Sequence, residues 1–255
     1  HNRPRWVIAD QAIQSAGGIG VPVYPTSTDE QLAYILNDSQ AKGVFVGDEH
    51  LMEQALRVKP KAPCLKLIVR MSPIKPRSDP SVTNFDELIL RGADSAEAQA
   101  EFENRRKALA EDDVAAIIYT SGTTGEPKGA VLTHSNFMAD LDMMLDATIT
   151  NKMMARGVRL SSLCHLPLCH IYGRTSDYHI QIAMAGQIYF AESYQKVPQN
   201  LLEVRPQMLV TIPRLYEKVY EMVHTQTAKM TGMQKRAFDW SLRVGNEVVD
   251  HLSSG

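Results

Sequence analysis

The sequence predicts a layered α/β fold with mostly parallel sheets flanked by helices. Short runs of β-branched residues alternate with amphipathic stretches of helical spacing along most of the chain. One such run, residues 114–119, has no polar alternation, which is typical of a strand buried on both faces. The chain of 255 residues is long enough to bury a sizeable core.

Composition excludes several classes of protein. The 27 basic and 29 acidic residues give a net charge of −2, so the chain has no bulk charge that favours nucleic acid or an anionic membrane. No apolar run approaches the roughly 18 residues of a membrane span. The three cysteines Cys64, Cys164 and Cys169 are too few for a disulfide scaffold and favour a reducing compartment, hence the cytoplasm.

The first part of the chain predicts helices and strands in alternation. Trp6, Ala9 and Ile13 share a helical face, with Pro4 suited to the first turn. Thr28 and Gln31 fit a capping box that starts a second helix. Strands are predicted at 21–24, 43–46 and 65–69, helices at 49–58, 85–91 and 96–109, and a proline-rich loop at 72–80.

The second part continues the pattern. Strands are predicted at 158–163, 187–190 and 208–211, and helices at 213–224 and 234–252. We therefore expect a first α/β subdomain at residues 1–157 and the start of a second at 158–255.

Residues 115–129, AAIIYTSGTTGEPKG, place hydroxyls, glycines and a lysine directly after a buried strand. Glycines let backbone N–H groups approach an anion, and a lysine adds a point charge for phosphate oxygens. Gly122 and Lys128 are six positions apart, so the usual Gly-x-x-x-x-Gly-Lys loop is absent. On composition alone, a strand-to-helix turn that binds nothing is the alternative.

The same string, continued by AVLTHSN at 130–136, resembles the phosphate-binding signature of the adenylate-forming enzymes. This superfamily includes acyl-CoA synthetases, luciferases and the adenylation domains of peptide synthetases. The resemblance implies part of the large N-terminal domain of such an enzyme, with the Thr124 hydroxyl near a Mg²⁺ ion. The residues it assigns to the ATP phosphates are Thr120, Ser121, Gly122, Thr123, Thr124, Gly125 and Lys128.

A second motif, LPLCHIYG, occupies residues 166–173. The pairs Cys164-His165 and Cys169-His170 offer four soft metal ligands, but their spacing matches no common zinc or haem pattern. A buried structural histidine is the other alternative. By resemblance to the acyl-activating families, the motif lines the acyl pocket, with His170 where substrate carboxylate and nucleotide meet and Tyr172 beside it.

Further strings are similar to the long-chain fatty acyl-CoA synthetases: VRPQMLVTIPRLYEK at 204–218, NRPRW at 2–6 and VYPTS at 23–27. The resemblance implies an AMP-forming fatty acid–CoA ligase that uses ATP, Mg²⁺ and CoA, with Lys128 and His170 in catalysis. A homodimer and peripheral membrane contact are further expectations. Activation of an aryl or amino acid, or a non-catalytic module of the same fold, are the alternatives.

Three family features do not occur in this chain: the Tyr-Gly-x-Thr-Glu motif, the Thr-Gly-Asp motif and the C-terminal lid domain with its lysine. We therefore predict a fragment from the N-terminal region of a larger enzyme. This fragment is expected to be inactive alone.

Overall fold

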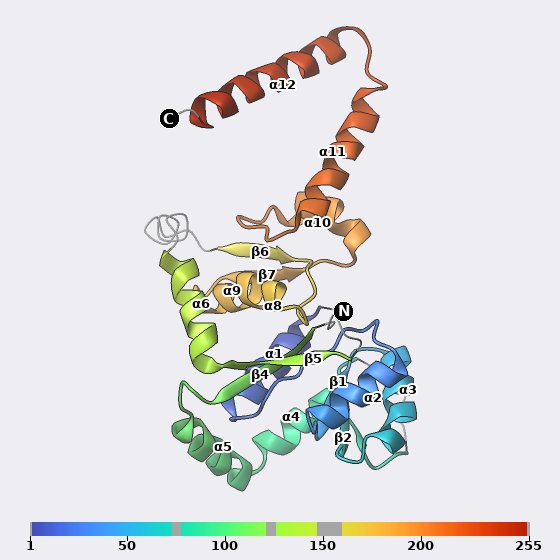
Figure 1. The fold of residues 1–255 in the computed structure, drawn as a ribbon, viewed down its shortest axis with the longest axis vertical. Helices are drawn as coiled ribbons and strands as arrows, with labels where there is room; N and C mark the ends of the chain where they lie inside the picture. Colours follow the sequence, from blue (N-terminus) through green and yellow to red (C-terminus); the bar gives the residue numbers. More distant parts are fainter. Residues whose placement is uncertain (1, 73–77, 121–125, 147–159, 254–255) are drawn as a thin grey trace. The chain divides into compact units, whose positions relative to one another are not determined.

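The computed structural model describes residues 2–72, 78–120, 126–146 and 160–253 (Figure 1). The chain divides into two compact units, His1–Val210 and Thr211–Gly255. The subdomain boundary expected after residue 157 falls outside the described residues and stays a prediction.

A parallel three-stranded sheet forms the first layer of the larger unit. Its strands β1 (Gly43–Val46), β2 (Leu67–Arg70) and β3 (Val82–Asn84) lie in the order β1-β2-β3. The predicted strand 65–69 begins two residues later, because the backbone N–H groups of Lys66 and Leu67 both bond to the Lys42 carbonyl as the chain enters the sheet. Strand β3 was not predicted, since the prolines before it indicated only a loop.

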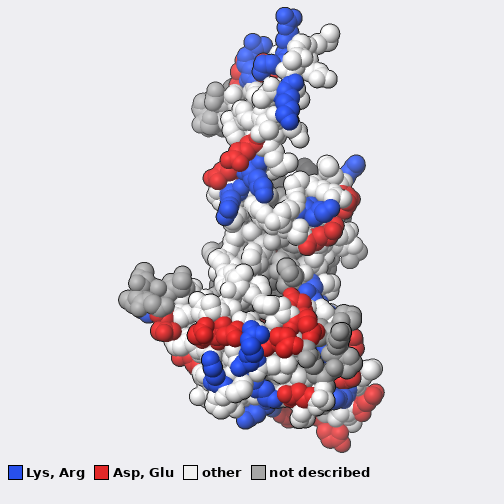
Figure 2. All heavy atoms as spheres, turned by 90° about the vertical axis from the view of Figure 1, so that its right-hand side faces the viewer, with Lys and Arg blue, Asp and Glu red and all other residues white. Residues whose placement is uncertain are grey.

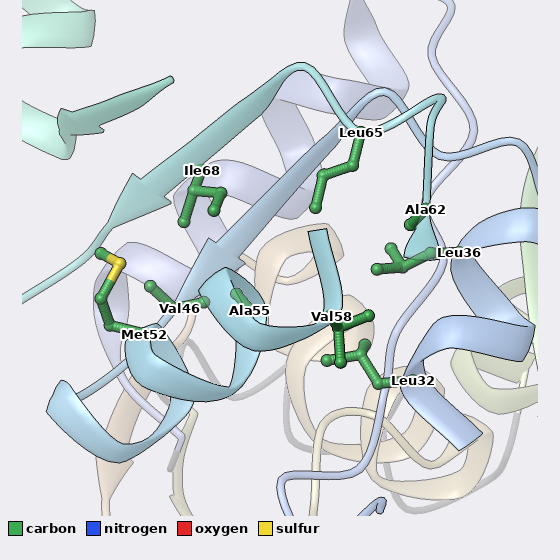
Figure 3. Packing of buried hydrophobic residues seen from close by; sticks show 9 residues of the cluster. All are labelled: Leu32, Leu36, Val46, Met52, Ala55, Val58, Ala62, Leu65 and Ile68. Atoms are coloured by element: carbon green, nitrogen blue, oxygen red, sulfur yellow. The ribbon is translucent and has the colours of Figure 1, made fainter. Parts of the chain in front are cut away.

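Helices α2 (Asp29–Asp38) and α3 (Glu49–Val58) cover one face of this sheet. The capping box predicted at the start of α2 is present: Thr28 accepts from the backbone N–H of Gln31, whose side chain accepts in return. Figure 3 shows the apolar side chains that helices and strands bury together. Met52 and Ile68 are fully buried there, and each such side chain contributes about 1.5–3 kcal/mol. The cluster is Leu32, Leu36, Val46, Met52, Ala55, Val58, Ala62, Leu65 and Ile68.

Helix α1 (Pro4–Ser15) begins at the predicted proline and packs toward a second core. In that core Ala9 meets Val69, Met71 and Phe85, the first residue of α4 (Phe85–Ala93). Helix α5 (Ala96–Ala108) buries no residue and carries surface ion pairs such as Arg105–Glu101 at 2.7 Å. Figure 2 shows one face of the molecule, on which acidic and basic side chains both occur and neither sign of charge covers the surface alone.

Strands β4 (Val114–Thr120) and β5 (Lys128–Thr133) form an antiparallel pair, and α6 (His134–Asp146) follows. The glycine-rich segment therefore joins two strands rather than a strand and a helix. The strand predicted at 21–24 does not form. Gly20 makes a single parallel bridge to Ala116, and Pro22 has no backbone N–H to extend the ladder.

A parallel pair, β6 (Ser161–Cys164) and β7 (Gln187–Phe190), forms the third sheet. Between them run α8 (Ile171–Gly173), the π-helical segment η2 (Arg174–His179) and α9 (Ile180–Ala183). The strand predicted at 208–211 is reduced to one bridge, from Met208 to Ser162. The strand β7 is followed by the short η3 (Tyr194–Lys196) and by α10 (Val197–Val204). The predicted α/β class with mostly parallel sheets is confirmed.

The smaller unit consists of α11 (Pro213–Thr227) and α12 (Gly232–Ser253), close to the two helices predicted there. Pro213 sits in the first turn of α11, where its missing N–H costs nothing. Within the described ranges, no helix combines the length and apolar character that a bilayer crossing needs.

Candidate functional site

The open end of the β4–β5 pair holds two of the residues predicted to contact phosphate. Thr120 and Lys128 lie directly opposite each other in the strand register, and both side chains are exposed. The other five, Ser121, Gly122, Thr123, Thr124 and Gly125, lie outside the described residues. A hydroxyl and an ammonium at the mouth of a glycine-rich connection are suited to binding an anion.

Strand β4 holds this hairpin in place through its buried face. Ala115, Ala116 and Ile118 pack with Phe137 of α6. At the carboxyl end of the strand, the Tyr119 hydroxyl donates a 2.5 Å hydrogen bond to Asp38 Oδ2 of α2. Burial and the Asp38 carboxylate both raise the pKa of Tyr119, so the phenol stays protonated. The strand thus joins two layers of the unit just before the phosphate segment begins.

The second motif places His170 at the start of α8. Its Nδ1 atom accepts a 3.1 Å hydrogen bond from the backbone N–H of Tyr172, so the ring caps the helix. His170 is exposed and Tyr172 is 43% exposed. His170 therefore does not fill the core, and both side chains remain accessible to a ligand.

One residue connects the two motifs. Ile171, between His170 and Tyr172, packs against the cluster of Ala115, Ala116, Ile118 and Phe137. The turn that carries His170 therefore packs against the cluster that β4 and α6 form before the phosphate segment. The sequence separates these motifs by about forty residues, and the fold brings them to one hydrophobic cluster.

A buried ionic network that the sequence analysis missed braces this region. The Asp10 carboxylate of α1 accepts from Arg174 Nη2 at 2.6 Å and Nε at 3.1 Å, and from the Tyr178 hydroxyl at 2.5 Å. Arg174 is fully buried, and its guanidinium also lies 5.1 Å from the centre of the Phe137 ring. The network ties α1 and α6 to the segment that follows His170. Asp10 lies among the apolar residues Trp6, Ala9 and Ile13 of α1, and this position was the available signal, because a buried carboxylate requires a partner.

The electrostatics of the network are set by burial and by close charges. Burial opposes ionisation of Asp10, but the neighbouring His179 and Arg174 side chains outweigh it and lower the pKa of Asp10. Burial lowers the pKa of His179, whose Nε2 lies 4.0 Å from Asp10 Oδ2. The network therefore consists of an ionised pair beside a neutral imidazole.

Asp177, in the π-helical segment, is a second buried carboxylate besides Asp10 of α1. It is fully buried, and within the described part of the chain neither oxygen has a hydrogen-bond partner of good geometry. Burial raises its pKa, against the smaller opposing effects of the nearby Ser162 and Cys164 side chains. Burial likewise raises the pKa of the Cys164 thiol, which makes it a poor nucleophile.

The described residues contain no group of three or more His, Cys, Asp and Glu side chains arranged to hold a metal ion. Thr124, the residue assigned to Mg²⁺, lies outside them.

An α/β scaffold with an exposed threonine and lysine at the mouth of a hairpin, and a histidine-capped turn, is suited to a nucleotide-dependent enzyme. Residues 1–250 match the model of the AMP-binding enzyme family. The chain therefore belongs to that family.

Its relatives include ligases of long-chain fatty acids. The chain is 28% identical over 96% of its length to the long-chain-fatty-acid–CoA ligase ACSBG2 of Gallus gallus, of which it covers 32%. It is 31% identical over 94% of its length to the long-chain-fatty-acid–CoA ligase FadD15 of Mycobacterium bovis, of which it covers 39%. The chain thus spans about a third of the length of these relatives.

Solved structures share the fold. The ATP-bound MatB of Rhodopseudomonas palustris superposes with a TM-score of 0.60 at 20% identity, over 85% of this chain and 39% of that one. The anthranilate–CoA ligase AuaEII, in complex with anthranoyl-AMP, gives 0.62 at 16% identity, over 82% and 38%. At these identities the comparison shows the fold alone.

Proposed function

We propose that the protein containing this chain activates a fatty acid with ATP and then transfers the acyl group to coenzyme A. The observation that carries the proposal is the TSGTTGEPKG segment between β4 and β5, with Thr120 and Lys128 at its mouth, in a chain of the AMP-binding family. The names of the relatives support a long-chain acid as the substrate class.

In the proposed reaction, a carboxylate oxygen of the fatty acid attacks the α-phosphorus of ATP and pyrophosphate leaves. The sulfur of CoA then attacks the carbonyl carbon of the acyl-adenylate, AMP departs, and the thiol proton goes to solvent. A carboxylate is a poor electrophile, and adenylation supplies it with a good leaving group. The protein contributes positioning and charge neutralisation.

Within this proposal, Lys128 and the hydroxyls of residues 120–124 hold the triphosphate. When bound, Mg²⁺ would neutralise phosphate charge, and Thr124 is its proposed neighbour. His170 and Tyr172 face the substrate carboxylate and the start of the acyl chain. Their exposure at the start of α8, on a turn packed against the cluster of β4 and α6, supports these roles.

Isotope exchange between pyrophosphate and ATP tests the proposal on the full-length protein. We expect exchange that depends on added hexadecanoate and not on benzoate or an amino acid. If benzoate or an amino acid supports exchange and hexadecanoate does not, the substrate is another carboxylate and not a fatty acid. No exchange with any acid, in a protein that still binds ATP, would make the chain part of a non-catalytic module.

The same proposal places the enzyme in the cytoplasm, as a homodimer with peripheral membrane contact. Free, sparse cysteines support a reducing compartment. Sedimentation of the purified protein with and without lipid vesicles measures both its oligomeric state and its membrane contact.

A further inference from the structure

Arg174 carries its positive charge at a fully buried position. Its guanidinium binds the Asp10 carboxylate through two hydrogen bonds, from Nη2 to Oδ1 at 2.6 Å and from Nε to Oδ2 at 3.1 Å. A buried ion pair adds little to net stability, because removing both charges from water costs about as much as their attraction returns. Two bonds from a planar guanidinium do fix the direction and the distance of the partner. The pair is therefore better suited to setting a geometry than to stabilising the fold.

The Asp10 end of the pair is fixed on α1. Asp10 Oδ2 also accepts from Gln14 Nε2 at 3.0 Å and from the Tyr178 hydroxyl at 2.5 Å. The Tyr178 oxygen in turn accepts from Gln11 Nε2 at 2.7 Å. Gln11 and Gln14 belong to α1, as Asp10 does. The carboxylate that Arg174 binds is therefore held in one orientation relative to this helix.

The Arg174 end of the pair leads to His170. Arg174 follows α8 directly, and its backbone N–H donates to the His170 carbonyl at 3.0 Å. His170 is the N-cap of α8, so the two residues are the ends of a single helical turn. A displacement of the buried guanidinium would therefore displace the exposed imidazole as well.

Gly20 brings the backbone of β4 close to the same ion pair. Its N–H donates to the Ala115 carbonyl and its carbonyl accepts from the Ile117 N–H, both at 3.0 Å. A Cβ atom on Gly20 would lie 3.2 Å from Asp10 Oδ1 and 3.3 Å from Arg174 Nη2, which is closer than Cβ atoms usually approach. The absence of a side chain at Gly20 thus allows this contact between β4 and the pair.

Strand β4 continues from this contact to the mouth of the hairpin. Ile117 lies three positions before Thr120, which is opposite Lys128 in the register of β4 and β5. The guanidinium carbon also lies 5.1 Å from the centre of the Phe137 ring, which packs in one cluster with β4. One buried ion pair therefore contacts both the strand that ends at the hairpin mouth and the helical turn of the second motif.

We propose that Arg174 is a positioning residue for adenylation, because its ion pair with Asp10 sets the place of the His170 turn relative to β4 and Lys128. The inference rests on the proposed function, in which His170 meets the substrate carboxylate and Lys128 holds the triphosphate. Attack on the α-phosphorus requires the carboxylate oxygen at a fixed distance and direction, and a misplacement of about 1 Å can slow such a step roughly 100-fold. Arg174 itself does not touch the substrate in this scheme.

Arg174→Lys tests the proposal in the full-length protein, because lysine keeps the positive charge and loses the two parallel bonds. We expect kcat of hexadecanoate-dependent pyrophosphate exchange to fall about tenfold or more, with KM for ATP changed by less than about twofold. Adding Asp10→Glu, whose carboxylate reaches one methylene further toward the shorter lysine, should restore part of the lost rate. A lowered melting temperature with unchanged kcat at low temperature would overturn the proposal.

A milder variant serves if Arg174→Lys does not fold, as judged by circular dichroism. Gly20→Ala keeps every charge and places its Cβ atom against the pair, so it should lower kcat in the same way. Gly43→Ala in β1 is the matched control, because its Cβ atom would lie 3.7 Å from the Leu67 carbonyl oxygen, an ordinary contact. The control should keep the wild-type kcat. A wild-type kcat in Gly20→Ala would then overturn the proposal.

The imidazole signals of His170 report the position of its turn independently of activity. In protein with ¹⁵N-labelled histidine, these signals are identified by their absence from His170→Asn. They should shift in Arg174→Lys and in Gly20→Ala, but not in Gly43→Ala. Unchanged His170 signals in the folded variants would overturn the proposal whatever the rates. Absence of exchange with any acid in the wild type would instead refute the proposed function, and with it the role of Arg174 in adenylation.

Discussion

Lys128 is an exposed lysine at the mouth of the β4–β5 hairpin, so its removal should affect chemistry and not folding. Lys128→Ala in the full-length protein should slow adenylation by roughly 10² to 10³, equivalent to about 2–4 kcal/mol of transition-state stabilisation. Thermal unfolding should be nearly unchanged. The exposed Lys107→Ala on α5 is the control. A wild-type rate in Lys128→Ala would remove this residue from the mechanism.

His170 combines a structural contact with its proposed role in the site. Its imidazole accepts the backbone N–H of Tyr172, a capping interaction worth about 1 kcal/mol. Replacement by Asn keeps an N-cap acceptor, whereas replacement by Ala removes it. We expect both variants to lose fatty-acid-dependent pyrophosphate release, and only His170→Ala to melt slightly earlier. Intact activity in His170→Asn would show that the ring serves the helix cap alone.

Asp177 should destabilise the folded protein at neutral pH. Its folded-state pKa is raised by burial, so its contribution to stability is fully present only below the unfolded value near 3.8 and is lost as pH rises through the folded pKa. Asp177→Asn should therefore raise the melting temperature at pH 7, and the gain should shrink in acid. If Asp177→Asn instead lowers the melting temperature equally at pH 7 and in acid, the carboxylate makes an essential contact.

At the scale of elements, the close packing of the β4–β5 hairpin depends on Gly129. A Cβ atom at this position would lie 2.7 Å from Cγ2 of Ile117, a stiff β-branched neighbour. Gly129→Ala should cost about 1–3 kcal/mol of unfolding free energy and displace the adjacent Lys128. The control Gly92→Ala in α4 meets nothing within 4 Å. Urea denaturation of the two variants measures the difference, and equal midpoints would show that the hairpin adjusts freely.

The elements differ in how well local sequence predicted them. The capping box of Thr28 and the strand at 43–46 follow from residues close together in the chain, and both are confirmed. The predicted strand at 21–24 contains Pro22, and a single bridge at Gly20 takes its place. The hairpin was missed because β5 forms by pairing with β4, and the register that pairs them is not a property of either strand alone.

At the scale of the whole molecule, the Asp10 network predicts weakening in acid. Burial keeps His179 neutral and lowers its pKa, so the stability it supports is fully present above about 6.5 and declines as pH falls toward the folded pKa. Asp10, with a lowered pKa, adds a further loss only below its unfolded value near 3.8. Urea midpoints should therefore fall between pH 7 and pH 5.

The variant His179→Asn tests whether His179 causes this fall of the urea midpoint. His179→Asn has no titrating ring, so its midpoint should change less than that of the wild type over the same interval. Protonation of Asp177 as pH falls stabilises the folded protein, because the pKa of this carboxyl is raised by burial. Asp177→Asn removes this compensation and should make the urea midpoint fall more steeply with decreasing pH. An identical slope in wild type and His179→Asn would place the pH dependence elsewhere in the protein.

The amino-acid sequence by itself determined the α/β class, most helix bounds, and the two motifs that carry the family resemblance, because these depend on periodicity, caps and spacing within short segments. Only the tertiary structure showed that Asp10 pairs with Arg174, 164 positions away. Only the tertiary structure brought the turn of His170 to the hydrophobic cluster that β4 forms with α6. Such arrangements depend on how sheets and helices pack, and no local pattern in the chain specifies which distant partners meet.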